Sequence, residues 1–433
     1  MKVKPVKNVN YCATTAKVIN TIALDNCDNV QAAIVLGSQI IVGKDTNIGD
    51  VGVFFPIECK LSDTFLSSNN LYRHSEKNKD TEKKGYFEDS GRLRAVKFRG
   101  HKSEGLFMPM SCLDFIRNGL DLGPGQDFDE LEGIPICEKY VIVRKSPTGN
   151  RQGKKALKRI SRLVENQFRL HRDTAQLKKY VHFIKPDDII SITSKLHGTS
   201  AVFGNVLVKR KLPIRDKIAR LFGVKVIETE YDLVYSSRNV VKNENFFVRP
   251  QYSFYDTNVW EEWSNKLHEF IPKGMSIYAE IVGYLSSGGA IQKGYHYGCD
   301  DSKSELYIYR ITQTNVDGVV TELTRPEIDE FCTRNKLKAT PLLYYGKAGE
   351  LYPFLLHRDD WNGKFLEELI DDIGFGMGDT MCKMNNSEVP SEGIVLRVEG
   401  IYSPTPYKLK NYAFLERETK LLDAGEEDIE EAN

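Results

Sequence analysis

The stretch that decides the fold is "DDIISITSKLHGTSAVFG", residues 187–204. Apolar residues recur at alternate positions before and after its glycine, which predicts a strand, a turn and a second strand. Lys195 ends the first predicted strand, and Gly198 allows the backbone to approach a phosphate closely. Thr199 and Ser200 supply hydroxyl donors. The amine at the rim of the sheet is therefore either an ordinary solvated lysine or a group held there for chemistry.

The short pattern K-x-x-G does not decide between these two interpretations. It occurs three times in the chain, beginning at Lys97, at Lys102 and at Lys195. A motif this short matches often by chance. A lysine on a turn is in most cases simply exposed, so the interpretation depends on what else the sequence provides.

Six further residues follow Lys195 in order, each in or at the end of a run of strand-forming residues. They are Arg238 in "YSSRNVV", Glu280 in "IYAEIVGY", Tyr309 in "LYIYRI", Glu392 in "SEGIVLRVEG", and Lys408 and Lys410 in "YKLKNYAF". Alternation along a strand sends Lys408 and Lys410 to the same face. Charged groups in strands this apolar are costly to bury unless they have partners. Taken singly, each of the six also has an ordinary interpretation as a surface or core residue.

This ordered set resembles the covalent nucleotidyltransferases, the superfamily of ATP-dependent ligases and capping enzymes. K-L-H-G-T-S has His197 where DNA ligases and capping enzymes usually carry aspartate. Together with "GGAIQKGYHYGC" after Glu280 and the closing K-L-K-N, it resembles the nick-sealing RNA ligases and editing ligases. Only 23 residues follow Lys410, without the R-x-D-K signature of a C-terminal OB domain. The extra domain in front of the motifs resembles the family-five RNA ligases, which have an N-terminal OB-type domain.

The resemblance implies a role for each charged motif residue. Lys195 would be the nucleophile that accepts AMP from ATP. Lys408 and Lys410 would neutralise the α-phosphate and the leaving group. Glu280 and Glu392 would hold Mg²⁺ (or Mn²⁺) and its waters, because hard cations prefer oxygen ligands.

The resemblance also implies a set of nucleotide contacts. Tyr309 would stack on adenine, with Tyr307 as the alternative, and Arg238 would contact the ribose or the nucleic-acid end. Three residues of the nucleophile motif would contact the cofactor: Leu196, His197 and Gly198. His197 has a second interpretation, in which its ring only braces the turn.

The implied reaction is a series of three nucleotidyl transfers. Lys195 takes AMP from ATP and releases pyrophosphate, the AMP passes to a 5′-phosphate, and a 3′-hydroxyl then attacks that activated end. The attacking lysine must be neutral although its ordinary pKa is ~10.4. A nearby metal ion and cations such as Lys408 would lower that pKa. The implied nucleic-acid partner is a nicked duplex with an RNA 3′-OH end.

Composition is that of a soluble globular protein. Of the 433 residues, 41% are hydrophobic and 28% charged, and no apolar run approaches the ~20 residues that cross a bilayer. The N-terminal residues lack the apolar core of a secretory signal. The eight cysteines include no C-x-x-C pair, which predicts reduced thiols and disfavours a zinc site. We therefore expect an intracellular, cytoplasmic protein that acts as a monomer.

The expected fold class is α+β, in four regions. Residues 1–140 alternate short apolar runs with Gly- and Pro-containing turns, which predicts an OB-like β-barrel. Residues 141–182 are expected to form a basic linker and a helical segment, and residues 183–415 a nucleotidyltransferase domain of antiparallel sheets and helices. Residues 416–433 read as an acidic tail. A second basic run, 208–225, predicts a short helix, and both basic runs are either solvated surface or contacts for a phosphate backbone.

Three rival functions remain open at this point. An ATP-dependent DNA ligase or a capping-type nucleotidyltransferase would share the chemistry. A catalytically inactive nucleic-acid-binding relative would share the fold, although no motif position is lost from the sequence. An adenylyltransferase would modify something other than nucleic acid. Separate trials of ATP, GTP and NAD⁺ would discriminate the first from an RNA ligase.

Overall fold

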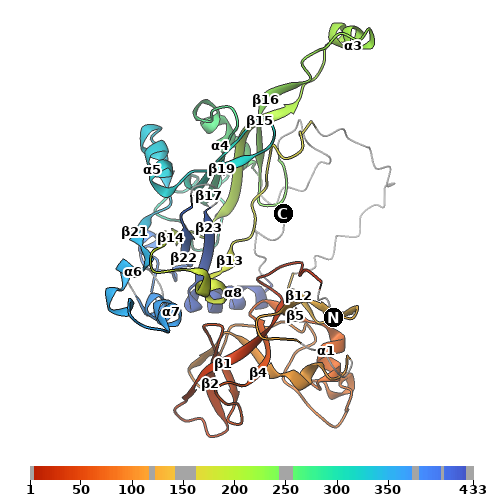
Figure 1. Cartoon of the computed structure of the whole chain (residues 1–433), viewed down its shortest axis with the longest axis vertical. Coiled ribbons are helices and arrows are strands. Elements are labelled where there is room, and N and C mark those ends of the chain that lie inside the picture. The colour runs from red at the N-terminus through yellow and green to blue at the C-terminus, as the bar shows by residue number, and fades with distance from the viewer. Residues whose placement is uncertain are drawn as a thin grey trace.

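The computed structural model describes residues 4–116, 122–141, 162–242, 257–372, 380–400 and 404–425. Figure 1 shows an N-terminal group of strands at one end of the molecule and two larger sheets beyond it. Helix α8, close to the end of the chain, lies between these two parts. Helices and strands both contribute, so the expected α+β class is confirmed.

The N-terminal part is a small, nearly closed barrel of antiparallel strands, as expected. Its main sheet has the order β3-β2-β1-β4-β8, and β9 pairs with β1. The members of this sheet are β1 (Ala13–Ala23), β2 (Val30–Val35), β3 (Ser38–Gly43), β4 (Val51–Pro56), β8 (Gly105–Pro109) and β9 (Asp127–Phe128). Phe55, Phe65 and Phe128 are fully buried at the centre of its core, which also takes in helix α1 (Asp63–Ser68).

Three short strand pairs complete this N-terminal part. They are β5 (Cys59–Leu61) with β12 (Cys137–Lys139), β6 (Val96–Phe98) with β7 (His101–Ser103), and β10 (Glu130–Leu131) with β11 (Ile134–Pro135). The β6–β7 hairpin is antiparallel and turns at Arg99 and Gly100, both of which have positive φ angles.

The larger part contains two mainly antiparallel sheets. The first sheet has the order β16-β15-β17-β18-β19, with β20 parallel to β18. Its strands are β15 (Thr199–Lys209), β16 (Thr229–Ser236), β17 (Met275–Gly283), β18 (Ser304–Thr314), β19 (Val320–Glu322) and β20 (Lys338–Ala339). The second sheet has the order β13-β23-β22-β14-β21. Its strands are β13 (Ala175–Gln176), β14 (Ile189–Lys195), β21 (Leu342–Lys347), β22 (Gly393–Val398) and β23 (Thr405–Lys410).

Helices cover one face of each sheet and leave the other face for the site. Trp260 of α4 and Ile328 of α5 are buried against the first sheet, and Phe365 of α7 is buried against the second. The helices of this part are α2 (Leu177–Tyr180), α3 (Ile214–Leu221), α4 (Val259–Leu267), α5 (Arg325–Arg334), α6 (Ala348–Leu351), α7 (Trp361–Asp371) and α8 (Tyr412–Asp423). Single 3₁₀ turns occur at Ser75–Lys77, Met110–Leu113, Val181–Phe183, His268–Phe270, Pro353–Leu355 and Lys383–Asn385.

The two strands predicted around Lys195 are present, but they do not form a hairpin. Strand β14 pairs with β21 and β22, whereas β15 pairs with β16 and β17. The turn after Lys195 therefore carries the chain from one sheet to the other. Alternation along β14 directs Ile190 and Ile192 into the core under α7 and Thr193 into a cavity between the sheets.

Two expectations about segments are wrong in the described residues. Helical spacing predicted a helix over 156–182, of which 156–161 lie outside the described residues. Between residues 162 and 182 the only α-helical turn is α2. Leu163 and Phe168 instead pack beside Val206 and Val208 of β15, so their apolar spacing reflects contacts with a sheet. An acidic tail was expected from residue 416, but residues 416–423 belong to helix α8. Phe414 and Thr419 of this helix are buried.

The remaining elements agree with the sequence. The basic run predicted to be helical contains α3, and the eight cysteines, all of them described, are unpaired thiols. Among the described residues, no helix is long and apolar enough to cross a membrane.

Candidate active site

The two sheets and the N-terminal barrel enclose a cavity of about 850 Å³. Nine residues singled out from the sequence line it. They are Lys195, Leu196, His197, Arg238, Glu280, Tyr309, Glu392, Lys408 and Lys410. The tenth, Gly198, follows His197 in the chain, and its backbone N–H donates to Glu280 Oε1 at 3.0 Å. Residues separated by more than 200 positions thus meet at one place.

Strand register brings the lysines together. Gly393 on β22 is paired with Lys195 on β14 and with Lys410 on β23, so the two lysines flank the same point of the sheet. Lys195 Nζ lies 2.7 Å from Glu392 Oε1, and Lys410 Nζ lies 3.9 Å from the same oxygen. A buried carboxylate, only 3% exposed, therefore sits between two amines.

Lys408 is the most deeply buried cation of the group. It faces the same cavity as Lys410, as the predicted alternation along β23 requires. Burial, followed by the positive charges of Lys410 and Lys195, lowers the pKa of Lys408 to about 7. An anion such as a phosphate would restore the charged form of this side chain by pairing with it.

Glu280 fixes the turn that follows the nucleophile candidate. It lies on β17, directly opposite Ser200 of β15, and accepts the Gly198 N–H. A Cβ atom on Gly198 would stand 2.2 Å from the carbonyl oxygen of Ile281, so only glycine fits this approach. The turn is also held by Tyr297, whose hydroxyl accepts the His197 N–H at 2.7 Å.

His197 has an aromatic setting. Its ring meets Tyr295 and Phe414 edge-on, with centroid distances of 4.9 and 5.0 Å. These contacts fit the bracing interpretation of His197, and the residue also lines the cavity.

Tyr309 and Tyr307 lie in different environments. Tyr309 lines the cavity, where its hydroxyl is 2.9 Å from His171 Nδ1 and 3.4 Å from Ser200 Oγ. Tyr307, two positions earlier, is buried in a separate cluster with Leu196 and is not among the lining residues described. Of the two tyrosines, Tyr309 is therefore the one that a ligand in the cavity would meet.

Arg238 is held by a carboxylate that the sequence did not single out. Its guanidinium donates to Asp173, which also lines the cavity. Asp173 and His171 belong to the extended segment before β13, where a helix had been predicted. No spacing or motif in the sequence marks either residue.

A model of the RNA ligase family matches residues 188–410, more than half of the 433 residues. The chain belongs to the RNA ligase family. An OB-fold domain model matches residues 12–110. No curated protein sequence matches the chain.

Three solved structures of an RNA ligase from Naegleria gruberi share this ligase's fold. A variant with AMP and Mn has 18% identity and a TM-score of 0.57, covering 94% of this chain and 98% of that chain. A variant with ATP and Mn has 17% identity and a TM-score of 0.55, covering 95% and 99%. A structure with PPi has 17% identity and a TM-score of 0.56, also covering 95% and 99%.

Glu418 is a site residue of this RNA ligase that sequence reasoning missed. Both of its carboxylate oxygens lie 3.2 Å from Lys410 Nζ. Burial alone would raise the pKa of Glu418, but the charges of Lys410 and His197 outweigh burial and lower that pKa. The residue lies in helix α8, in a segment that had been interpreted as an acidic tail because of its many Asp and Glu residues.

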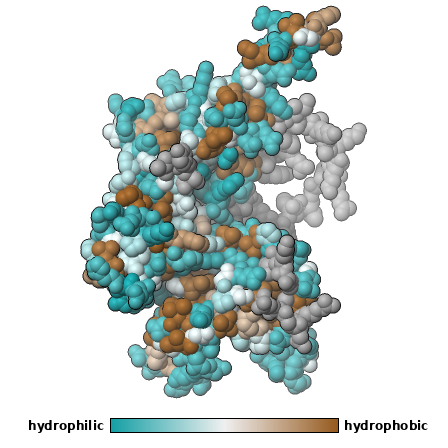
Figure 2. Space-filling view, in the orientation of Figure 1, coloured by the Kyte–Doolittle hydropathy of each residue, from teal (hydrophilic) through white to brown (hydrophobic). Residues whose placement is uncertain are grey.

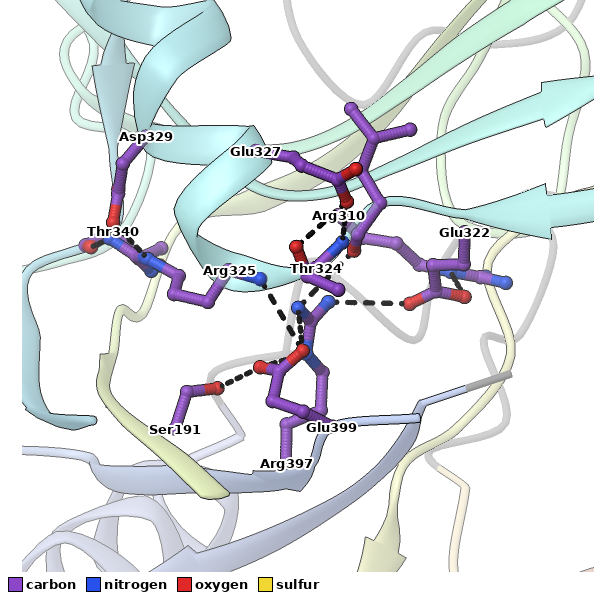
Figure 3. A network of polar contacts seen from close by, with 11 residues as sticks. Ser191, Arg310, Glu322, Thr324, Arg325, Glu327, Asp329, Thr340, Arg397 and Glu399 are labelled. Carbon is purple, nitrogen blue, oxygen red and sulfur yellow. Dashed lines mark hydrogen bonds and ion pairs between the residues drawn. The ribbon is translucent and has the colours of Figure 1, made fainter. Parts of the chain in front are cut away.

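Figure 3 shows a network of ion pairs and hydrogen bonds, and several of its residues line the cavity. Arg397 of β22 pairs with Glu399 at 2.8 Å and with Glu322 of β19 at 3.4 Å, and Glu322 also accepts from Arg310 at 2.7 Å. Ser191 of β14 donates to Glu399 at 2.6 Å. Because these residues come from both sheets, the network fixes the sheets relative to each other.

The acidic residues fit a divalent cation only in part. Glu392 Oε2 is buried and has no hydrogen-bond partner, which leaves one carboxylate oxygen available as a ligand. Across the described part of the chain, however, no three His, Cys, Asp or Glu side chains cluster in a way that could hold a metal ion. This fits Mg²⁺, which usually takes one or two carboxylates and completes its shell with phosphate oxygens and water.

Proposed function

We propose that this RNA ligase uses ATP to join 3′-OH and 5′-phosphate ends through an AMP adduct on Lys195. One observation carries the proposal: Lys195, Lys408, Lys410, Glu280 and Glu392 line one cavity, with the Lys195 amine 2.7 Å from a buried carboxylate. The fold is shared with an RNA ligase whose structures hold ATP, AMP and PPi. ATP and a divalent metal ion are therefore the proposed cofactors.

In the first transfer, the Lys195 nitrogen forms a bond to the α-phosphorus as the bond to the departing pyrophosphate breaks. The amine must lose its proton before attack, because only the neutral amine has a free electron pair. Lys408 and Lys410 stabilise the negative charge that builds up on the phosphate and pyrophosphate oxygens.

We propose that Glu392 and Glu280 hold the divalent ion, with Mg²⁺ or Mn²⁺ as the species. Glu392 offers an oxygen without a hydrogen-bond partner, and Glu280 contributes a nearly buried carboxylate on the opposite sheet. When bound, the ion would neutralise phosphate charge. Tyr309 is proposed to stack on adenine, and Arg238 to contact the ribose or the nucleic-acid end.

The proposed substrate is a nicked duplex with an RNA 3′-OH end. In the second transfer the 5′-phosphate oxygen bonds to the AMP phosphorus and Lys195 leaves. In the third, the 3′-hydroxyl oxygen bonds to the 5′-phosphorus and AMP leaves. Barrel residues such as Lys139 line the cavity beside the lysines, which supports a role for the barrel next to the break.

The free thiols support a proposed intracellular location, because reducing compartments keep cysteines unpaired. We also propose that the enzyme acts as a monomer.

Labelling with α-³²P ATP and Mg²⁺ tests the proposal. The denatured wild-type polypeptide should carry label, and Lys195→Ala should carry none. Lys97→Ala and Lys102→Ala are matched controls, because those K-x-x-G lysines lie on the β6–β7 hairpin, where Lys97 pairs with Glu416. Labelled GTP or NAD⁺ in place of ATP should give no adduct. Label that persists on the Lys195 variant would refute the assignment.

A further inference from the structure

A basic arm projects from the first sheet. The arm comprises residues 209–228 and contains helix α3, which connects the outer ends of β15 and β16. Figure 1 shows α3 at the far end of the molecule from the barrel, beyond the edge of both sheets. None of the residues of α3, all of which the structure describes, is buried, so the helix contributes nothing to a hydrophobic core.

The arm exposes large apolar side chains that a soluble surface ordinarily hides. Leu221 is 84% exposed, Phe222 78%, Ile214 76% and Ile227 71%. Ile214, Ile218 and Leu221 recur at helical spacing, so they form one stripe along α3. Figure 2 shows hydrophobic and hydrophilic residues side by side at this tip. A contiguous apolar surface of this kind marks an interaction site.

Positive charge accompanies the apolar stripe. Between 209 and 228 the chain has seven basic residues and two acidic ones, Asp216 and Glu228. Both acids are engaged within the arm, since Arg210 donates to Asp216 and Arg220 lies 3.1 Å from Glu228. The arm therefore presents apolar side chains within a net positive rim.

We propose that the arm docks on an anionic lipid bilayer, with the α3 stripe among the acyl chains and the basic residues at the headgroups. Interfacial helices combine these two features: Phe, Leu and Ile on one face and Lys or Arg on the other. Anionic headgroups supply the complementary charge, and each basic residue near the surface adds to binding. The tip is the outermost part of the molecule in Figure 1, so a flat surface reaches it without meeting the sheets.

Duplex RNA fits the arm less well. A phosphate backbone would satisfy the lysines and arginines, but Ile214, Leu221 and Ile227 have neither a stacking face nor hydrogen-bonding groups for bases. Those side chains would remain in water, and their exposure would stay unexplained. A bilayer accounts for both the charge and the apolar area.

Vesicle co-sedimentation tests the proposal on the full-length protein. We expect wild type to bind vesicles of phosphatidylcholine mixed with anionic phosphatidylglycerol, and not vesicles of phosphatidylcholine alone. Leu221→Asp with Phe222→Asp should weaken binding at least about tenfold, because the apolar insertion is lost. Lys217→Ala and Lys225→Ala should each weaken it about fivefold and flatten the dependence on salt.

The control is Phe354→Asp, which replaces an exposed aromatic residue outside the arm and should leave vesicle binding unchanged. Because the substituted arm positions are exposed, thermal unfolding midpoints should match wild type. Failure of wild type to bind anionic vesicles would overturn the proposal, as would equal binding by the Leu221→Asp, Phe222→Asp protein. Loss of nicked-RNA binding by that protein without any vesicle binding would identify the arm as a nucleic-acid contact instead, and a change in its oligomeric mass would identify contact between copies.

Discussion

At Lys410 the side-chain amine contacts carboxylates from two distant segments. Glu392 comes from the residue before β22, and Glu418 comes from helix α8. The ring of Phe414 lies below the same amine, 5.0 Å from Nζ to the ring centroid. Three contacts of this kind restrict where the amine can point, which is what a lysine that stabilises developing charge requires.

Glu418 therefore acts as a positioning residue for Lys410. Glu418→Ala should slow AMP transfer to the protein roughly ten- to a hundredfold, because Lys410 loses both acceptor oxygens. Glu418→Gln should recover part of that rate, since it retains one acceptor. The measurement is single-turnover formation of the AMP adduct. Glu416→Gln, on the same helix but paired with Lys97 and Lys420, should behave as wild type; an equal loss in both variants would contradict the role of Glu418.

The lowered pKa of Lys408 makes the free energy of unfolding depend on pH. Burial and neighbouring cations lower its pKa to about 7, against ~10.4 in an unfolded chain. Between these two values the unfolded chain binds more protons, so this residue makes the free energy of unfolding rise with pH from about 7 to about 10. Lys408→Met should abolish AMP transfer, yet raise the free energy of unfolding at pH 7 by a few kcal/mol.

Urea unfolding at pH 7 and pH 9 checks this expectation. The increase in the free energy of unfolding from pH 7 to pH 9 should be larger for wild type than for Lys408→Met. Lys420→Met, which changes a mostly exposed lysine, should keep the wild-type gain. Equal gains for wild type and Lys408→Met would show that Lys408 does not titrate in this window.

The sequence pointed to five charged residues that line the cavity, but it gave no sign of Glu418 or Asp173 and left all of their contacts open. Lys195, Glu280, Glu392, Lys408 and Lys410 are recognisable because charges inside apolar strands are unusual. The sequence could not tell which of Tyr309 and Tyr307 faces the cavity. The two residues are two positions apart in one strand, so regular alternation would place both on the same face. The register of β17 and β18 shifts between Tyr278 and Ala279, and such irregularities have no sequence signal here.

Among the secondary-structure elements, strands β14 and β15 determine the geometry of the site, because the turn between them carries the chain from one sheet to the other. The strands were predictable from period-two alternation, but their membership of different sheets was not, because local pattern does not specify pairing partners. The failed helix prediction over 156–182 has a similar cause in its described part, which begins at residue 162. Leu163 continues the three-residue spacing of Leu157 and Ile160, but Leu163 and Phe168 contact β15 from a segment that is not helical.

Gly198 offers a direct test of this turn. Gly198→Ala places a Cβ atom 2.2 Å from the Ile281 carbonyl oxygen, so the turn must move away from β17 and from Glu280. We expect loss of AMP transfer and a free energy of unfolding lower by about 1–3 kcal/mol. Gly363→Ala in α7 is the matched control: its Cβ meets nothing, and alanine should stabilise the helix by about 1 kcal/mol. Unchanged AMP transfer in Gly198→Ala would contradict the proposed geometry.

For the whole molecule, helix α8 joins the barrel to the catalytic sheets. Arg92 of the barrel, with a side chain only 2% exposed, lies 2.8 Å from Glu58 and 3.0 Å from Asp423 of α8. Tyr412 donates to the Val96 carbonyl at 2.7 Å at the other end of the helix. Since α8 also carries Glu418, the barrel supports the helix that positions Lys410.

Arg92→Ala should weaken this connection. It removes the buried partner of Glu58, whose side chain is only 14% exposed, and an unpaired buried charge costs about 3–5 kcal/mol. We expect faster hydrogen exchange over residues 412–423 together with slower AMP transfer. Arg94→Ala is the control, because Arg94 reaches the same Asp423 from a more exposed position and such pairs contribute little. Faster hydrogen exchange without any change in AMP transfer would contradict a role of the barrel in positioning Lys410.

The most direct test of the central claim is the location of AMP on the protein. After reaction with ATP and Mg²⁺, peptide mass spectrometry under neutral conditions should find one added AMP on the peptide that contains Lys195. Added hydroxylamine at acidic pH should release it, as expected for a bond between phosphorus and nitrogen. AMP on a peptide that contains Lys97, Lys102 or Lys410, or no adduct at all from active enzyme, would contradict the account.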